Sequence, residues 1–207
     1  MEKFNLERPS FERKDEIIEY INEFVEYNSE INGTGGLDKI IEGYTFEQAL
    51  ERCLSMEDAN YAKKINRCQS KTFLLIREND NRIVGTINVR WNLTEEMKLF
   101  GGNIGYGIRP TERRKGYNKI NLYLGLIEAQ KLGLDRVMLD CDVSNLGSSK
   151  TMEALGGELE RTEIDPYDGI LTSVYQFDVT KTIDKYREEY ENKIYKREKE
   201  KSYVKSK

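Results

Sequence analysis

The segment 103–118, Asn-Ile-Gly-Tyr-Gly-Ile-Arg-Pro-Thr-Glu-Arg-Arg-Lys-Gly-Tyr-Asn, constrains the fold more than any other part of the chain. Between Asn103 and Arg109, apolar or aromatic residues alternate with glycine or polar residues, which is the period of a strand with one buried face. Gly105 and Gly107 leave the other face bare. We therefore expect another group to approach the backbone of this strand closely.

A basic turn follows the strand. Pro110 cannot donate to a sheet ladder and ends the strand, and three consecutive cations at 113–115 then precede Gly116 and a helical run. The first N–H groups of a helix are unpaired and carry partial positive charge, so they favour an anion, and glycine lets the backbone approach it. The turn is therefore a predicted phosphate site.

The segment Arg113–Asn118 resembles the pyrophosphate loop of the GNAT (Gcn5-related) N-acetyltransferases, Arg/Gln-x-x-Gly-x-Gly/Ala. A Gly-Gly-x-Ile-Gly-Tyr strand precedes the loop and an Asn145-x-x-Ser148 element follows it, in the order that is typical of the family. A looser resemblance extends from about residue 70 to residue 179. Asn118 departs from the motif, because a small residue is usual at its end.

The bulk composition limits the possible functions. A chain of 207 residues is long enough for one domain with a core, and its net charge of −4 disfavours a general nucleic-acid binder. Three cysteines without a paired pattern and the absence of histidine disfavour a zinc site, so we expect no metal and reduced thiols in the cytoplasm. No apolar run approaches the ~20 residues of a membrane span.

Periodicity and turn residues predict an alternation of helices and strands. The expected elements are a strand at 3–8, a helix at 10–28, a helix at 46–54 after a Thr45/Gln48 capping box, strands at 72–77, 82–91 and 103–109, a helix from 117 to 133, a strand at 136–143, a short helix ending at 155, and a hairpin of strands 158–164 and 170–179. Strand 82–91 is expected to place Ile83 and Ile87 on one face and Asn88 and Arg90 on the other, where they would contact substrate or solvent.

The resemblance implies a fold and a domain boundary. It indicates an α/β (α+β) three-layer GNAT-like fold with a central mixed, mostly antiparallel sheet flanked by helices, in a domain covering residues 1–180. Residues 181–207 are rich in charge and are expected to form a helical or disordered tail. The loop 31–36 is either part of the acceptor pocket, as in the family, or a plain connection between helices.

The resemblance also implies acetyl-CoA as cosubstrate. Its pantetheine would lie where the strand 103–109 splays from the strand 136–143, and its pyrophosphate would bind the amides of the basic turn. The cofactor-binding residues expected from this comparison are Ile108, Arg109, Arg113, Arg114, Lys115, Gly116, Tyr117, Asn118, Asn145, Ser148 and Met152.

The chemistry implied by the family is direct attack of an amine on the thioester. The expected catalytic residues are Asp142 as base, with Asp140, Glu95 and Glu96 as alternatives, Asn103 to orient water, and Tyr123 as acid, with Tyr106 and Tyr175 as alternatives. The tyrosine that family members commonly carry four residues after the serine is Met152 here.

Three hypotheses about function remain open at this level. The first is an N-acetyltransferase that acts on a small-molecule or peptide amine, without nucleic-acid or membrane partners and possible as a homodimer. The second is a non-catalytic acyl-CoA- or nucleotide-binding module, which the missing histidine, Asn103 and Met152 would fit. The third is a partner-binding protein that acts through its tail.

Overall fold

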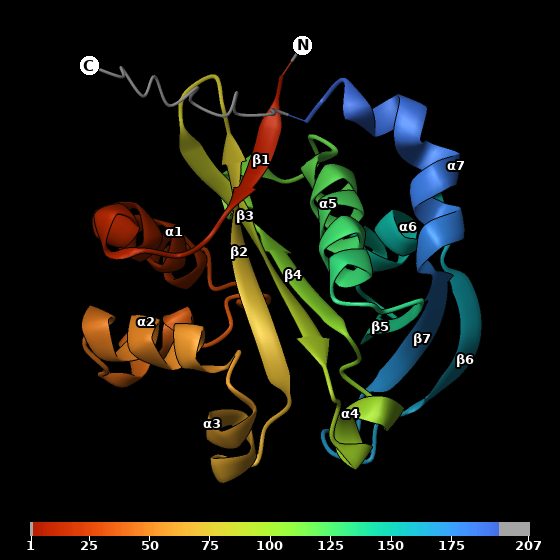
Figure 1. Ribbon diagram of the computed structural model, residues 1–207, viewed down its shortest axis with the longest axis horizontal. Coiled ribbons are helices and arrows are strands. Elements are labelled where there is room, and N and C mark those ends of the chain that lie inside the picture. Colours follow the sequence, from red (N-terminus) through yellow and green to blue (C-terminus); the bar gives the residue numbers. More distant parts are fainter. Residues whose placement is uncertain (1, 195–207) are drawn as a thin grey trace, which may run out of the picture.

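The computed structural model describes residues 2–194 and arranges its elements in three layers (Figure 1). Helices α1 and α2 pack on one face of the central strands, and α5 packs on the other, with α7 against α5 and the end of β7. The helices are α1 (Lys14–Glu26), α2 (Phe46–Ser55), α3 (Ala59–Lys64), α4 (Glu95–Leu99), α5 (Tyr117–Lys131), α6 (Leu146–Ala154) and α7 (Val179–Glu191). The strands are β1 (Phe4–Glu7), β2 (Gln69–Arg77), β3 (Arg82–Trp91), β4 (Ile104–Ile108), β5 (Arg136–Asp142), β6 (Glu158–Ile164) and β7 (Leu171–Asp178). The expected fold class is confirmed.

The strands form two antiparallel sheets, in the orders β1-β2-β3-β4 and β5-β7-β6. The Thr45/Gln48 capping box that begins α2 is present as expected. Two short helices, α3 and α4, were not expected from the sequence, and the side chains of Asp58 and Thr94 cap them. In each cap, a side-chain oxygen accepts a hydrogen bond from the backbone amide three residues later in the sequence. These helices were missed because the capping residues are not followed by a helical repeat of apolar residues.

A β-bulge reverses the side-chain alternation of β3. The pairing with β2 skips Val84, because Ile83 and Gly85 pair with consecutive residues of β2. Ile83 therefore packs with α1 and α2, whereas Val84 and Ile87 pack with α5. The expectation that Ile83 and Ile87 share a face is wrong, because a strict period of two cannot anticipate an inserted residue.

The two sheets are joined where β4 begins. The backbone N–H of Asn103 donates to the carbonyl oxygen of Met138 on β5 at 2.7 Å. The Asn103 side chain extends the same link, because its Oδ1 accepts from the Met138 N–H at 2.9 Å and its Nδ2 donates to the Arg90 carbonyl at 3.1 Å. The amide is thus committed to the backbones of β3 and β5. The expected catalytic role of Asn103 is corrected to a structural one.

The glycines of β4 accommodate other parts of this chain. A Cβ atom on Gly107 would lie 2.7 Å from the carbonyl oxygen of Asn32, and one on Gly105 would lie 2.5 Å from Nη2 of Arg90. Likewise, a Cβ on Gly33 would lie 2.5 Å from the Cα of Tyr106. The loop 28–36 and the Arg90 guanidinium therefore occupy the face that the sequence analysis left open for a ligand.

Helix α7 belongs to the core, although the sequence analysis assigned it to a tail. Ile183 and Tyr190 are buried, and the Tyr190 ring stacks on Tyr123 of α5 with centroids 4.8 Å apart. Ile194 forms an isolated β-bridge with Phe4 of β1. The fold thus continues past residue 180, and the rest of the expected tail, residues 195–207, lies outside the described residues.

The junction at Asn103 predicts a stability change. We expect Asn103→Ala to lower the free energy of unfolding by about 2 to 4 kcal/mol, because the Met138 N–H would remain buried without that acceptor. Urea unfolding measures the change. Asn60→Ala, at an exposed position on α3, is the matched control and should shift stability by less than ~0.5 kcal/mol. Similar losses in the two variants would contradict the bridging role.

Candidate active-site cleft

A cleft of about 590 Å³ lies where β4, the basic turn and the first turns of α5 and α6 converge. The end of α1 and the loop after it close one side, through Phe24, Ser29 and Asn32. Eight of the residues expected to bind the cofactor line this cleft: Ile108, Arg113, Arg114, Gly116, Tyr117, Asn118, Asn145 and Ser148. Segments more than 100 residues apart in sequence, from Phe24 to Ser148, thus meet at one site.

The basic turn presents backbone amides to this cleft. Arg114 and Gly116 have left-handed backbone conformations, with φ of 63° and 82°, which bend the chain into the start of α5. Gly116 is the N-cap and has no side-chain cap, so the first amides of the helix are free to bind an anion. A glycine is favoured at 116 because its φ is rarely adopted by other residues.

One edge of β4 faces away from β3. The Arg109 N–H donates to the Val84 carbonyl of β3 at 2.9 Å. Because backbone groups alternate along an antiparallel strand, those of Gly107 and Gly105 also point towards β3. The backbone groups of Tyr106 and Ile108 therefore point to the opposite edge, which borders the cleft. An extended ligand could pair with this edge as an additional strand would.

The three cations of the turn have different environments. The Arg113 Nε donates to the Ile108 carbonyl at 3.2 Å, its Nη2 donates to Ser29 Oγ at 2.7 Å, and its guanidinium lies over the Phe24 ring. Arg114 is exposed, and among residues 2–194 no carboxylate pairs with it or with Arg113. The Lys115 ammonium instead pairs with Glu112 at 2.8 Å and is not part of the cleft lining, which corrects its expected role.

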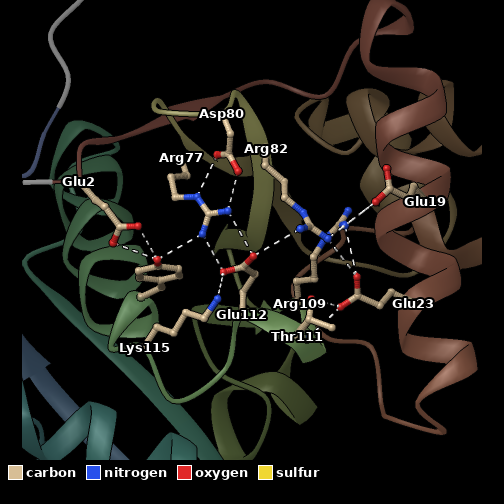
Figure 2. Close-up of polar contacts among 11 residues, drawn as sticks. Glu2, Glu19, Glu23, Arg77, Asp80, Arg82, Arg109, Thr111, Glu112 and Lys115 are labelled. Carbon is tan, nitrogen blue, oxygen red and sulfur yellow. Dashed lines mark hydrogen bonds and ion pairs between the residues drawn. The ribbon is translucent and has the colours of Figure 1, made fainter.

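A network of buried ion pairs fixes the turn on the side away from the cleft (Figure 2). Glu112 is 2% exposed and pairs with Arg77 at 2.7 Å as well as with Lys115. Arg77 in turn bonds Asp80 and the Tyr117 hydroxyl. The network therefore ties the turn and the start of α5 to the β2–β3 hairpin.

Arg109 belongs to the same framework. Its guanidinium is 1% exposed and pairs with Glu19 at 2.7 Å and with Glu23 at 3.3 Å on α1 (Figure 2). The Glu23 carboxylate also accepts from the backbone N–H and the hydroxyl of Thr111. Arg109 is not among the cleft residues, so its expected contact with the cofactor is corrected to a structural contact with α1.

The start of α6 forms the opposite wall. The Asn145 side chain caps this helix by accepting from the Ser148 N–H at 3.1 Å. Asn118 reaches across from α5 and donates to Thr151 Oγ1 at 3.4 Å, while its own Oδ1 is buried without a hydrogen-bond partner. Thr151 lines the cleft, whereas Met152 is fully buried in the main core. The expected cofactor contact of Met152 is thus corrected, because the helix turns this side chain inwards.

Tyr106 is the tyrosine that the structure places in the cleft. Its hydroxyl is buried and has no hydrogen-bond partner among the described residues. Burial raises the pKa of this phenol above its ordinary value, and the nearby Ser148 and Asn118 side chains offset that only in part. The phenol therefore stays protonated well into the alkaline range.

The other expected catalytic residues lie elsewhere. Tyr123 is buried against α7 and donates to the Ile183 carbonyl at 3.4 Å, so its role as acid is corrected. Asp142 is not part of the cleft lining and accepts from the Ser144 N–H at 2.6 Å, which is a turn contact. Asp140 accepts from the Gly101 N–H, and Tyr175 donates to Glu153 at 3.0 Å.

The cleft also contains Phe24, Ser29, Asn32 and Thr151, which were not among the expected site residues, although the loop 31–36 that contains Asn32 was a candidate for a pocket wall. Thr151 follows Ser148 at helical spacing and could have been found from the helix alone. The first three come from the end of α1 and its loop, and no local pattern links that region to β4. Among residues 2–194, no cluster of acidic or cysteine side chains could hold a metal, and no helix is long and apolar enough to cross a membrane.

Comparison with known proteins agrees with this geometry. A family model described as an acetyltransferase (GNAT) domain matches residues 38–158, more than half of the chain. The chain therefore belongs to the GNAT acetyltransferase family, and its activity class is acetyl-CoA-dependent acyl transfer. No curated protein matches the sequence.

Solved structures share the fold at low identity. A ribosomal-protein-S5-alanine acetyltransferase from Vibrio fischeri has a TM-score of 0.61 and 18% identity, covering 86% of this chain and 94% of its own. A spermidine/spermine N-acetyltransferase from Vibrio cholerae has a TM-score of 0.59 and 14% identity, with 88% and 98% covered. A microcin C7 self-immunity acetyltransferase, solved with acetyl-CoA and AMP, has a TM-score of 0.58 and 16% identity, with 85% and 92% covered.

The buried network under the turn predicts how stability depends on pH. Burial of Glu112 acts to raise its pKa, but its bonds to Lys115 and Arg77 prevail, so the pKa lies below its ordinary value of 4.5. Because the pKa of Glu112 is lower in the folded state than in the unfolded state, its ionised form stabilises the fold. This contribution is complete at pH values above the unfolded-state pKa and is lost as the pH falls through the folded-state pKa.

We expect Glu112→Gln to lower the free energy of unfolding by about 3 kcal/mol at pH 7, because it removes the buried carboxylate that Arg77 and Lys115 share and leaves Arg77 only its partly exposed partner Asp80. The difference from wild type should begin to shrink near pH 4.5, where Glu112 of the unfolded state becomes protonated, and should be lost once the pH falls through the lower folded-state pKa. Urea unfolding at several pH values measures both effects. Glu95→Gln, which removes a largely exposed pair with Lys98, is the control, and an equal effect there would contradict the network's role.

Proposed function

We propose that the chain transfers an acetyl group from acetyl-CoA, bound in the cleft between β4 and α6, to a primary amine. The observation that carries this proposal is the turn 113–118, where free helix-start amides and two cations without carboxylate partners face one cleft. Such a turn suits the pyrophosphate of CoA. The pantetheine arm would then pair with the backbone of Tyr106 and Ile108 at the free edge of β4.

The proposed reaction is a direct transfer. The neutral amine attacks the thioester carbonyl, a C–N bond forms, the C–S bond breaks, and CoA leaves as a thiol once it gains a proton. The N–H of Tyr106, which points to the cleft and lies farther from the turn than Ile108, is the proposed hydrogen-bond donor to the thioester carbonyl oxygen, and the Tyr106 carbonyl and the Ile108 backbone are left to the pantetheine arm. No cysteine needs to act, and all three are buried free thiols.

Tyr106 is the proposed source of the proton that the leaving thiolate takes. Its hydroxyl lacks a partner in the cleft wall, and its raised pKa keeps it protonated at neutral pH. Tyr106 would thus replace the tyrosine that Met152 displaces from α6. The proposed base is solvent, because Glu112 is already committed to ion pairs and Glu30, the other carboxylate among the described lining residues, is exposed next to Ser29, which bonds Arg113 of the turn.

The proposed setting is the cytoplasm, in line with the free thiols, and the proposed assembly is a homodimer. The edge strand β6 supports the second point, because Leu159 and Ile164 on it are 57% and 65% exposed. β6 lies at the edge of its sheet, so its outer backbone groups are open to pairing, and a second copy would cover these two apolar side chains.

Tyr106→Phe tests the assignment. With the amine that releases CoA fastest from acetyl-CoA, we expect kcat to fall by about 10²-fold, since general acid catalysis is typically worth that much or more, and CoA affinity to change little. The wild-type rate should rise with pH through one ionisation and show no fall near pH 10, because the pKa of Tyr106 is raised. Tyr123→Phe, a buried tyrosine outside the cleft, is the control. A wild-type kcat in Tyr106→Phe would refute the role of this residue.

A further inference from the structure

A second cavity, of about 310 Å³, lies behind β4 on the side of α2. Its walls come from the loop 31–36, the start of η2 (Leu37–Glu42), α2, and the polar face of β2 and β3. Asn32 lines both this cavity and the acetyl-CoA cleft, so the two are separated by the loop that packs on β4. A ligand in the second cavity would therefore lie next to the proposed reaction site.

Arginine dominates the charge of this cavity. Arg52, Arg67 and Arg90 all line it, and none of them has a carboxylate within ion-pair distance among the described residues. The fourth cation, Lys39, pairs with Glu42 at 2.6 Å. One acidic side chain lines the cavity, that of Asp38, and it already accepts from the Thr34 hydroxyl. The cavity is thus strongly cationic in a chain whose net charge is −4.

Arg90 shows that this charge is held in place rather than merely solvated. Its Nε donates to Asn88 Oδ1 at 2.8 Å and its Nη1 donates to the Gly101 carbonyl at 2.7 Å. Its Nη2 lies against Gly105 and has no hydrogen-bond partner among residues 2–194. Burial lowers the pKa of Arg90 and the neighbouring Arg67 adds to that effect, while the charge of Asp140 acts against it. Two guanidinium groups held near one another with no carboxylate in ion-pair contact favour an anion between them.

We infer that this cavity selects an acceptor that carries a carboxylate or phosphate group close to its reactive amine, and that it discriminates against polyamines. The anion would bind Arg52, Arg67 and the free Nη2 of Arg90, and Asn88 and Ser70 line the same wall. The amine end of such an acceptor would extend past Asn32 to the thioester. A polycation would meet three unpaired arginines and be repelled. This inference rests on the proposed acetyl transfer.

Matched acceptor pairs test the inference. β-Alanine carries a carboxylate that β-alaninamide lacks, and phosphoethanolamine carries a phosphate that ethanolamine lacks. Spermidine serves as the polycation. With CoA release from acetyl-CoA as the readout, we expect kcat/KM to be at least about tenfold higher for the anionic member of one pair, and lowest for spermidine. The pair that shows the larger ratio identifies the carboxylate or the phosphate. Equal rates within both pairs, or a preference for spermidine, would overturn the inference.

Arginine variants locate the effect. Arg52→Gln and Arg67→Gln should each reduce kcat/KM for the anionic acceptor by about tenfold and leave that for its uncharged partner unchanged. Arg136→Gln, at an exposed site on β5, is the matched control and should change neither. The affinity for CoA, measured by calorimetry, should be the same in all of these proteins.

A binding measurement keeps the inference testable without turnover. Glutarate and inorganic phosphate are titrated into the protein in the presence of excess CoA, so that the phosphate turn is occupied. We expect one of these anions to bind, and Arg52→Gln or Arg67→Gln to weaken it by about tenfold. A protein that binds CoA but neither anion would overturn the inference alone. A failure to bind CoA would instead contradict the proposed function.

Discussion

The link between β4 and β5 through Asn103 sets the shape of the molecule. This side chain accepts from Met138 and donates to the Arg90 carbonyl, so it holds three strands together at one point. Beyond that point the two strands belong to different sheets, and the free edge of β4 borders the cleft. An amide suits this position because it offers a donor and an acceptor at once, which neither a carboxylate nor an apolar side chain does.

Charge is distributed between a buried framework and two open sites. Glu19, Glu23 and Glu112 neutralise the arginines that anchor the turn (Figure 2). The cleft-facing cations Arg113 and Arg114 have no carboxylate partner among the described residues. The same separation recurs behind β4, where Arg90 is fixed by neutral oxygens rather than by a carboxylate. A chain that is acidic overall can therefore present two local cationic sites, one suited to CoA phosphates and one proposed for the acceptor.

The sequence predicted most of the elements and the place of the basic turn, because both depend on local rules. Alternation identified the strands, and the glycine at position 116 with its neighbouring cations predicted a turn that the structure places at the start of α5 and on the cleft. Roles that depend on tertiary placement were predicted poorly. Arg109 and Lys115 have the charge and the position in the motif that suit a cofactor contact. Each is paired instead, Arg109 with Glu19 of α1 and Lys115 with the buried Glu112, and the motif alone does not reveal these partners. Asn103 and Tyr123 are polar residues near the motif whose partners come from β5 and α7.

The central claim is that the turn at the start of α5 binds the phosphates of acetyl-CoA, and two glycines at opposite ends of that helix test it most directly. Gly116 and Gly133 both have positive φ, 82° and 77°, and a Cβ on either would meet no atom within 4 Å among the described residues. Valine at each position should therefore strain the backbone to a similar degree. Calorimetry should show CoA affinity reduced by at least about tenfold in Gly116→Val and close to wild type in Gly133→Val. Equal CoA affinity in the two folded variants would contradict the claim.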